Sequence, residues 1–305
     1  MITTRSVALP HGITLECRVS GVAGRPVLLF LHGFPEGAFI WDEQLAHFAR
    51  PENGGYRCIA PSLRGFGASS SPAEVEAYRA RHLVQDLAAL IAAESPRAPL
   101  ECLVAHDWGG AVAWNLANQQ PQLLKRLAIL NSPHPGAFLR ELQHSPAQQA
   151  ASQYMHFLCR PDAEALLAEN DFRRLFGFFD TPGGSAPAWL TDAVRAQYRA
   201  LWQQGLTGAC NYYRASPLRP PRKNEEGSDD SVQAITLPDS MLTVSMPTLV
   251  LWGLDDPALL PGLLDGLPGW VPQLQLRPVE QASHWIVHEH PERVAQELAR
   301  FLQKQ

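Results

Sequence analysis

The segment Ala-His-Asp-Trp-Gly-Gly at residues 105–110 places an acidic residue, Asp107, where a nucleophile is expected. An apolar run at 100–104 precedes it, and a run typical of a helix at 111–119 follows it. A small residue, a reactive residue and a glycine at this spacing, between strand and helix, form the pattern of a nucleophile elbow, which usually carries Ser. A carboxylate there can attack a saturated carbon and become an ester, which water then hydrolyses. An Asp that only caps the following helix would fit the same pattern, so the rest of the chain must decide.

The elements that would position Asp107 are those of an α/β fold. Near-continuous apolar runs at 27–31, 100–104, 127–130 and 248–252 predict strands buried on both faces of a parallel sheet. An alternating run at 13–19 predicts a half-buried, antiparallel strand. Helical patterns at 41–48 and 81–93 separate the strands. This alternation predicts a mostly parallel central sheet with helices on both faces.

The alternation stops at residue 135 and resumes at 247. We therefore expect a core formed by residues 1–135 and 246–305, with an inserted helical domain at 136–245 that lies over the carboxyl edge of the sheet, where α/β folds bind ligands. Within the insertion, residues 216–240 are rich in proline and charge, which predicts a long irregular loop.

Composition and charge disfavour several classes of partner. The chain has 305 residues, 46% of them hydrophobic, and a formal net charge of −5 with no basic block, which disfavours nucleic acid or an anionic membrane as a partner. No apolar run is long enough to span a membrane, and the N-terminus lacks the apolar core of a signal peptide. The five cysteines are scattered along the chain, which is typical of reduced thiols, and their spacing does not match that of metal ligands. We expect a cytoplasmic monomer or homodimer.

An Asp nucleophile needs a base for the second-step water, and that base needs an orienting acid. Where a nucleophile elbow occurs in a hydrolase, the chain order is nucleophile, acid, His. Asp255 and Asp256 follow the apolar strand at 248–252, and spacing from that strand favours Asp256. His284 follows the last predicted strand, at 274–278. Asp107, Asp256 and His284 thus have the required order, although a surface His would fit position 284 equally well.

The turn His-Gly-Phe-Pro-Glu at residues 32–36 follows the first buried strand. It resembles the turn that supplies one oxyanion-hole donor in α/β-hydrolases, in which case the N–H groups of Phe34 and Trp108 would form that hole. An ordinary Gly-Pro turn is the alternative.

Taken together, these motifs resemble those of the α/β-fold epoxide hydrolases. The resemblance also covers Arg-Gly-Phe-Gly-Ala-Ser at 64–69, Asn-Tyr-Tyr-Arg at 211–214 and Ser-His-Trp at 283–285, and it runs from about residue 5 to 303. The core motifs are shared with other α/β-hydrolases, whereas the motif at 211–214 is more specific. One departure is Ala105, where the family often has Gly.

The resemblance implies two tyrosines of the inserted domain, or cap, as partners of the epoxide oxygen. Tyr213 matches one through the motif at 211–214, and Tyr154 matches the other by its distance from Pro161. A phenol can donate a hydrogen bond to an opening epoxide and yield its proton to an alkoxide. Either tyrosine could instead be a packed aromatic with its hydroxyl tied to the backbone.

The resemblance therefore implies hydrolysis of a small-molecule epoxide by water to a vicinal diol, through an ester on Asp107 and without a cofactor or a metal. Trp108, Pro35 and Trp285 are expected to line the substrate pocket.

Two alternatives remain open. A dehalogenase would use the same Asp-His-Asp set, but haloalkane dehalogenases usually have Asn in place of Phe34, and haloacetate dehalogenases usually have Arg in place of Trp108. A non-catalytic, ligand-binding relative would typically have lost part of this set. The absence of Ser from the elbow disfavours an ordinary esterase.

Overall fold

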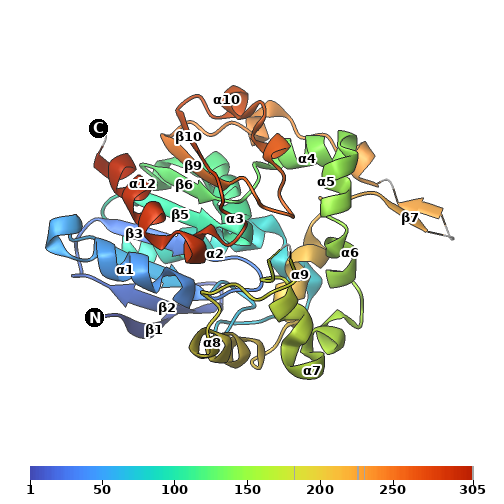
Figure 1. The fold of residues 1–305 in the computed structure, drawn as a ribbon. Coiled ribbons are helices and arrows are strands. Elements are labelled where there is room, and N and C mark those ends of the chain that lie inside the picture. The colour runs from blue at the N-terminus through green and yellow to red at the C-terminus, as the bar shows by residue number, and fades with distance from the viewer. Residues whose placement is uncertain (182, 225–226, 230, 304–305) are drawn as a thin grey trace.

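A computed structural model describes residues 1–181, 183–224, 227–229 and 231–303. Its centre is an eight-stranded sheet in the order β1-β2-β4-β3-β5-β6-β9-β10 (Figure 1). β1 and β2 are antiparallel to their neighbours, and the pairs from β4 to β10 are parallel. The strands are β1 (Thr3–Ala8), β2 (Thr14–Ser20), β3 (Val27–Leu31), β4 (Arg57–Pro61), β5 (Cys102–His106), β6 (Leu127–Leu130), β9 (Thr248–Gly253) and β10 (Leu274–Val279).

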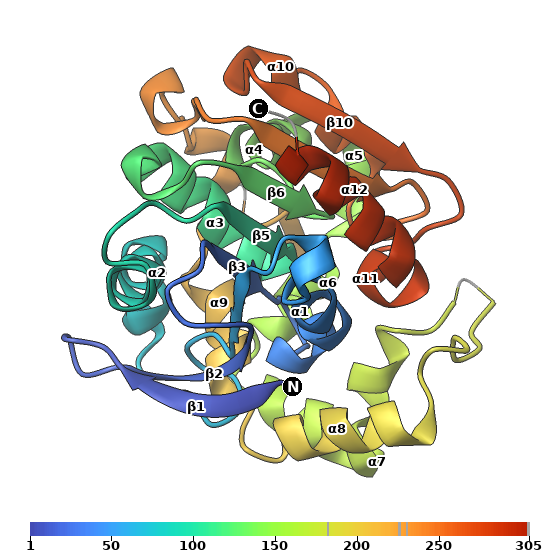
Figure 2. The same cartoon turned by 90° about the vertical axis from the view of Figure 1, so that its left-hand side faces the viewer.

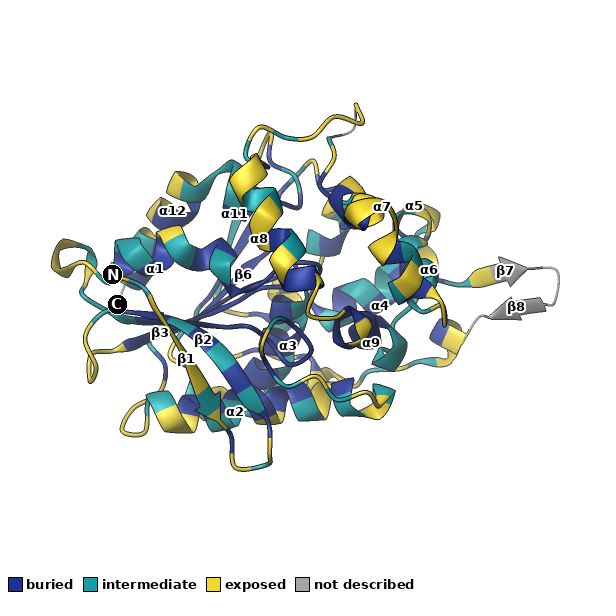
Figure 3. Cartoon of the chain, turned by 90° about the horizontal axis from the view of Figure 1, so that it is seen from below, coloured by how far each residue is buried: buried dark blue, intermediate teal, exposed yellow. Residues whose placement is uncertain are grey.

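Helices lie on both faces of this sheet, and Figure 3 shows the central strands as buried and the helices as partly exposed. The helices of the core are α1 (Asp42–Phe48), α2 (Ala80–Glu94), α3 (Asp107–Gln119), α10 (Leu267–Trp270), α11 (Ile286–Glu289) and α12 (Pro291–Gln303). Alternate residues of each buried strand face opposite layers: Leu28 and Phe30 pack with α1 and α12, whereas Leu29 and Leu31 pack with α2 and α3. Two-sided burial explains why these strands are apolar throughout.

A helical segment lies between β6 and β9, and no described residue between Leu130 and Thr248 joins the main sheet. Its helices are α4 (Pro135–His144), α5 (Pro146–Ala151), α6 (Tyr154–Leu158), α7 (Ala163–Gly177), α8 (Asp192–Trp202) and α9 (Thr207–Ala215). α7 is interrupted by a kink at residues 169–172. Figure 2 shows α7 and α8 together on the side of the molecule away from β10.

The structure differs from the sequence expectation in three places. β1 and β4 were not predicted, because charged or polar residues occur in β1 and β4 begins with Arg57, so that neither strand is apolar throughout. Within residues 216–240, which were expected to be irregular, β7 (Arg222–Asn224) and β8 (Gly227–Asp229) form an antiparallel hairpin. Figure 1 shows β7 extending away from the body of the molecule. No strong apolar alternation in the sequence marks residues 222–229.

Candidate active site

Asp107 sits on a sharp turn between β5 and α3, with a φ of +50°. Non-glycine residues seldom adopt this left-handed conformation, and such local strain is typical of functional sites. A hydrogen bond of 2.6 Å from the Ser132 hydroxyl to the Asp107 carbonyl oxygen stabilises this turn. The turn also requires Gly109, since a Cβ there would lie 2.5 Å from the His32 carbonyl oxygen. The predicted nucleophile elbow therefore has the backbone geometry that exposes the Asp107 side chain.

The turn at 32–36 faces the Asp107 carboxylate directly. The Phe34 N–H donates to Asp107 Oδ1 at 2.6 Å. Gly33 allows this approach, because a Cβ at that position would lie 2.1 Å from the same oxygen. A backbone N–H at this place also suits a negative charge that develops on Oδ1 during ester hydrolysis. The Trp108 amide, the second expected donor, remains a prediction.

His284 connects Asp107 to a buried acid. His284 Nδ1 lies 2.7 Å from Asp256 Oδ2, and His284 Nε2 lies 3.7 Å from Asp107 Oδ2. Asp256 is 2% exposed, whereas Asp255 is exposed to solvent. The structure thus brings Asp256, and not Asp255, to the histidine.

Asp256 is itself held in place by several donors. The Asn131 side-chain amide donates to Oδ2 at 2.9 Å, and the N–H groups of Ala258 and Leu259 donate to Oδ1. Burial would raise the pKa of this carboxyl group, but His284 and these hydrogen bonds hold the pKa below its ordinary range. Asp256 therefore stays ionised and fixes which nitrogen of His284 faces Asp107.

The charge on His284 is governed by the two carboxylates. Burial alone would lower the pKa of His284, but the negative charges of Asp256 and Asp107 outweigh it and raise the pKa to about 9. At neutral pH the resting site therefore holds an imidazolium between two carboxylates. Loss of the charge on Asp107 would lower the pKa of His284 and favour the neutral imidazole, which can accept a proton.

Tyr154 and Tyr213, from the helical segment, line the same cavity as Asp107. Tyr154 begins α6 and Tyr213 lies in α9, and their ring centroids are 6.0 Å apart. The two hydroxyls are hydrogen-bonded to each other, and Trp108 hydrogen-bonds to Tyr213. Burial, reinforced by the charge on Asp107, raises the pKa of both phenols. Both therefore stay protonated and can donate a hydrogen bond.

A cavity of about 230 Å³ joins these groups, with Asp107, Trp108, Tyr154 and Tyr213 on its wall. The remainder of the wall is mostly apolar and includes the side chains of Leu83, Phe138, Met155, Leu218, Ile235 and Leu237.

Pro35 and Trp285, which we expected in the pocket, are not among the residues that line this cavity. Trp285 is buried, and its indole donates to the Phe178 carbonyl oxygen at 3.1 Å. The Pro35 carbonyl oxygen accepts a hydrogen bond from Trp202. The Pro35 contact is thus with the helical segment, whereas Trp285 also packs against the ring of His284, with the ring centroids 4.8 Å apart.

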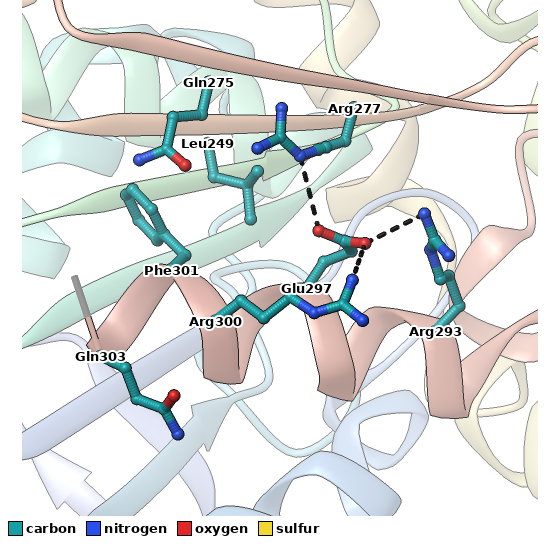
Figure 4. A pocket seen from close by; sticks show the side chains of 8 residues that line it. All are labelled: Leu249, Gln275, Arg277, Arg293, Glu297, Arg300, Phe301 and Gln303. Atoms are coloured by element: carbon teal, nitrogen blue, oxygen red, sulfur yellow. Dashed lines mark hydrogen bonds and ion pairs between the residues drawn. The ribbon is translucent and has the colours of Figure 1, made fainter.

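A second hollow of about 440 Å³ lies between β10 and α12, away from these residues. Arg277, Arg293 and Arg300 surround the buried carboxylate of Glu297 there (Figure 4). None of the residues predicted to carry chemistry lines it. In the part of the chain that the structure describes, no cluster of three or more His, Cys, Asp or Glu side chains is placed to hold a metal ion. Within the same residues, no helix has the length and apolar character needed to cross a membrane.

Sequence reasoning missed three supports of the site: Asn131, Ser132 and Glu36. Asn131 and Ser132 follow β6 directly, at the same carboxyl edge of the sheet as Asp107. That position was a usable signal, because the carboxyl ends of parallel strands converge there. Glu36 is fully buried and lies 3.3 Å from His106 through its Oε2. A single glutamate at the end of a turn carries no sequence signal of burial.

Comparison with known proteins agrees with this geometry. A family model described as the alpha/beta hydrolase fold matches residues 26–291. The AB hydrolase superfamily protein YfhM of Bacillus subtilis is 34% identical over 97% of this chain and 96% of its own length. A protein named epoxide hydrolase from Caballeronia sordidicola is 30% identical over 96% of this chain and 91% of its own length.

Solved structures of epoxide hydrolases are also similar to this chain. The crystal structure of Bacillus megaterium epoxide hydrolase in complex with an inhibitor superimposes with a TM-score of 0.86 at 28% identity, covering 98% of this chain and 100% of that one. Fold, elbow geometry and relatives together show that the chain belongs to the α/β-hydrolase fold family and is an enzyme of the epoxide hydrolase type.

Proposed function

We propose that this chain hydrolyses epoxides to vicinal diols through a covalent ester on Asp107. The observation that carries the proposal is that the Asp107 carboxylate and the phenols of Tyr154 and Tyr213 lie on the wall of one cavity. Relatives and structural neighbours named epoxide hydrolases support it. None of the three relatives described above is named a dehalogenase, and a leaving halide needs no proton from a phenol. In this proposal residues 136–245 act as the cap. The cytoplasmic location and the monomeric or dimeric state of the protein remain predictions.

In the first step, Asp107 opens the ring. Oδ1 is engaged by the Phe34 N–H, so we assign the attack to Oδ2. A bond forms between Oδ2 and a ring carbon while the carbon–oxygen bond of the epoxide breaks, and the electron pair moves to the ring oxygen. Tyr154 and Tyr213 stabilise that oxygen by hydrogen bonds, and one of them supplies the proton.

In the second step, water cleaves the ester. His284 removes a proton from water, the hydroxide attacks the ester carbonyl, and negative charge develops on Oδ1 beside the Phe34 N–H. Collapse of this intermediate breaks the bond between the carbonyl carbon and Oδ2, and the departing oxygen takes the proton held by His284, which releases the diol. The carboxylic acid left on Asp107 gives its proton back to the tyrosine that protonated the ring oxygen, which restores the carboxylate and the phenol. The diol therefore keeps an oxygen from Asp107, and water replaces that oxygen in the enzyme.

The first step prepares the base for the second. Asp107 loses its charge on becoming an ester, so one of the two carboxylates that raise the pKa of His284 to about 9 is neutralised. The pKa of His284 must then fall, which frees the imidazole to accept a proton when the ester is present.

This coupling predicts a pH dependence of ester hydrolysis. Because His284 must be neutral to act, the rate should rise with pH to a plateau, with an apparent pKa below 9. Single-turnover measurements of ester decay between pH 5 and about pH 10 would give this value, and NMR titration of His284 in the free enzyme would give the reference. An apparent pKa for ester decay equal to or above the free-enzyme value would contradict the coupling.

Tyr213→Phe is expected to slow alkylation by about 10²-fold while changing ester hydrolysis little, because the phenol acts on the ring oxygen. The matched control is Tyr212→Phe, since the adjacent Tyr212 hydroxyl donates to the Arg64 carbonyl oxygen at 2.9 Å. Rapid-quench kinetics of both variants would separate the two steps. A loss confined to ester hydrolysis in Tyr213→Phe would show that Tyr213 has another role.

The apolar wall of the cavity predicts a preference for apolar substituents. Each buried methylene contributes about 0.8 kcal/mol, so kcat/KM for 1,2-epoxyhexane should exceed that for 1,2-epoxybutane by roughly 15-fold. The two terminal epoxides share the same ring chemistry, which makes the ratio a measure of binding. Equal values would contradict an apolar substrate channel.

A further inference from the structure

Helix α8 of the helical segment binds the turn that carries Phe34. The Trp202 indole donates to the Pro35 carbonyl oxygen at 2.6 Å, and the Tyr198 hydroxyl donates to Glu36 Oε1 at 2.6 Å. Tyr198 and Trp202 are four residues apart in α8 and therefore share one face of the helix. Both side chains are buried. One helical turn of the insertion thus fixes two successive residues of a core turn.

Those two residues directly follow the oxyanion donor. The Phe34 N–H contacts Asp107 Oδ1, and the turn is closed by a hydrogen bond from the Glu36 N–H to the Gly33 carbonyl oxygen at 2.9 Å. The Phe34 amide is thus enclosed by a tight turn whose far end is attached to α8. A shift of Pro35 or Glu36 would change the direction of the Phe34 N–H.

Glu36 extends the connection to the catalytic base. Its Oε1 also lies 2.6 Å from His288 Nε2, and its Oε2 lies 3.3 Å from His106 Nδ1. On the other side of its ring, His106 Nε2 donates to the His284 carbonyl oxygen at 2.9 Å. Burying a carboxylate is costly unless it is paired and hydrogen-bonded, so the hydrogen bonds of Oε1 with Tyr198 and His288 hold Glu36 in one position.

We propose that Tyr198 and Trp202 are positioning residues that align the oxyanion-hole turn for ester hydrolysis. The inference rests on the proposed function, because it concerns the second step of that reaction. Docking of α8 on the core then sets how well the Phe34 N–H meets the charge that develops on Oδ1.

This role predicts opposite effects on the two steps. During alkylation, negative charge leaves the Asp107 carboxylate, so a well-aligned Phe34 N–H stabilises the starting state more than the transition state. During hydrolysis, charge develops on Oδ1, so the same N–H stabilises the transition state. A misaligned turn should therefore slow hydrolysis while leaving alkylation unchanged or faster. General loss of structure would lower both rates together.

The test uses Trp202→Phe and Tyr198→Phe, which remove the donors and keep the rings. Gln197→Ala is the matched control, because Gln197 is an exposed residue of the same helix. Rapid-quench kinetics with mass spectrometry of the Asp107 peptide gives the rate constants of ester formation and ester decay. Since their ratio is measured on the active sites that react, a fraction of unfolded protein does not alter it.

In both variants we expect ester decay to fall about tenfold with no fall in ester formation, so that the ester accumulates, and we expect the control to match wild type. A parallel fall in both rates, or no change in either variant, would overturn the inference while leaving the proposed function intact. If wild type itself forms no ester, the proposed function fails and this inference fails with it.

Discussion

Asp107→Ala is expected to abolish epoxide turnover, with kcat falling by about 10⁴-fold or more, because removal of a nucleophile leaves only binding and backbone electrostatics. Steady-state formation of diol from 1,2-epoxyhexane would measure the loss. Folding should be retained, since the hydrogen bond that supports the elbow is accepted by the Asp107 carbonyl oxygen rather than by its side chain.

Asp255→Ala is the matched control for this variant, because Asp255 is an exposed carboxylate next to the proposed orienting acid. It should keep wild-type turnover. Asp107→Asn is a poorer test, since the site's own water chemistry could convert Asn to Asp. Substantial activity in a homogeneous Asp107→Ala preparation would overturn the covalent scheme.

His284→Gln is expected to trap the reaction at the ester. Ester formation should continue, because the nucleophile and both phenols remain, whereas ester decay should fall by about 10²–10⁴-fold without a base for water. Mass spectrometry after addition of substrate should therefore show an adduct on the peptide that contains Asp107.

The control for this variant is His290→Gln, a nearby histidine whose ring contacts the Gln281 carbonyl oxygen. It should turn over without accumulating ester. Failure of His284→Gln to accumulate an adduct, together with ester decay at the wild-type rate, would show that another group activates the water.

The sequence was sufficient to predict the strands around Asp107, because each is buried on both faces and is therefore apolar throughout. The elbow and the turn at 32–36 could also be predicted, because each needs a glycine at a fixed position. A side chain at Gly33 would collide with Asp107, and one at Gly109 would collide with the His32 carbonyl oxygen. β1 and β4 lack such a pattern and were missed.

Other parts of the site depend on packing between distant segments. Spacing favoured Asp256 over Asp255, but burial of one and exposure of the other separate them clearly only in the structure. The contacts of Tyr198 and Trp202 with the turn join residues more than 160 positions apart. No local periodicity specifies such a pairing, because an aromatic residue on a buried helix face has the same pattern whatever it touches.

The covalent ester on Asp107 is the central claim, and a single turnover in ¹⁸O-labelled water tests it most directly. Enzyme in excess would be mixed with styrene oxide in labelled water, and the first diol would be compared with diol from later turnovers. The account predicts an unlabelled first diol and labelled later ones, because the first oxygen comes from Asp107 and each hydrolysis restores the carboxylate with oxygen from water. A labelled first diol would show that water attacks the ring directly and would contradict the account.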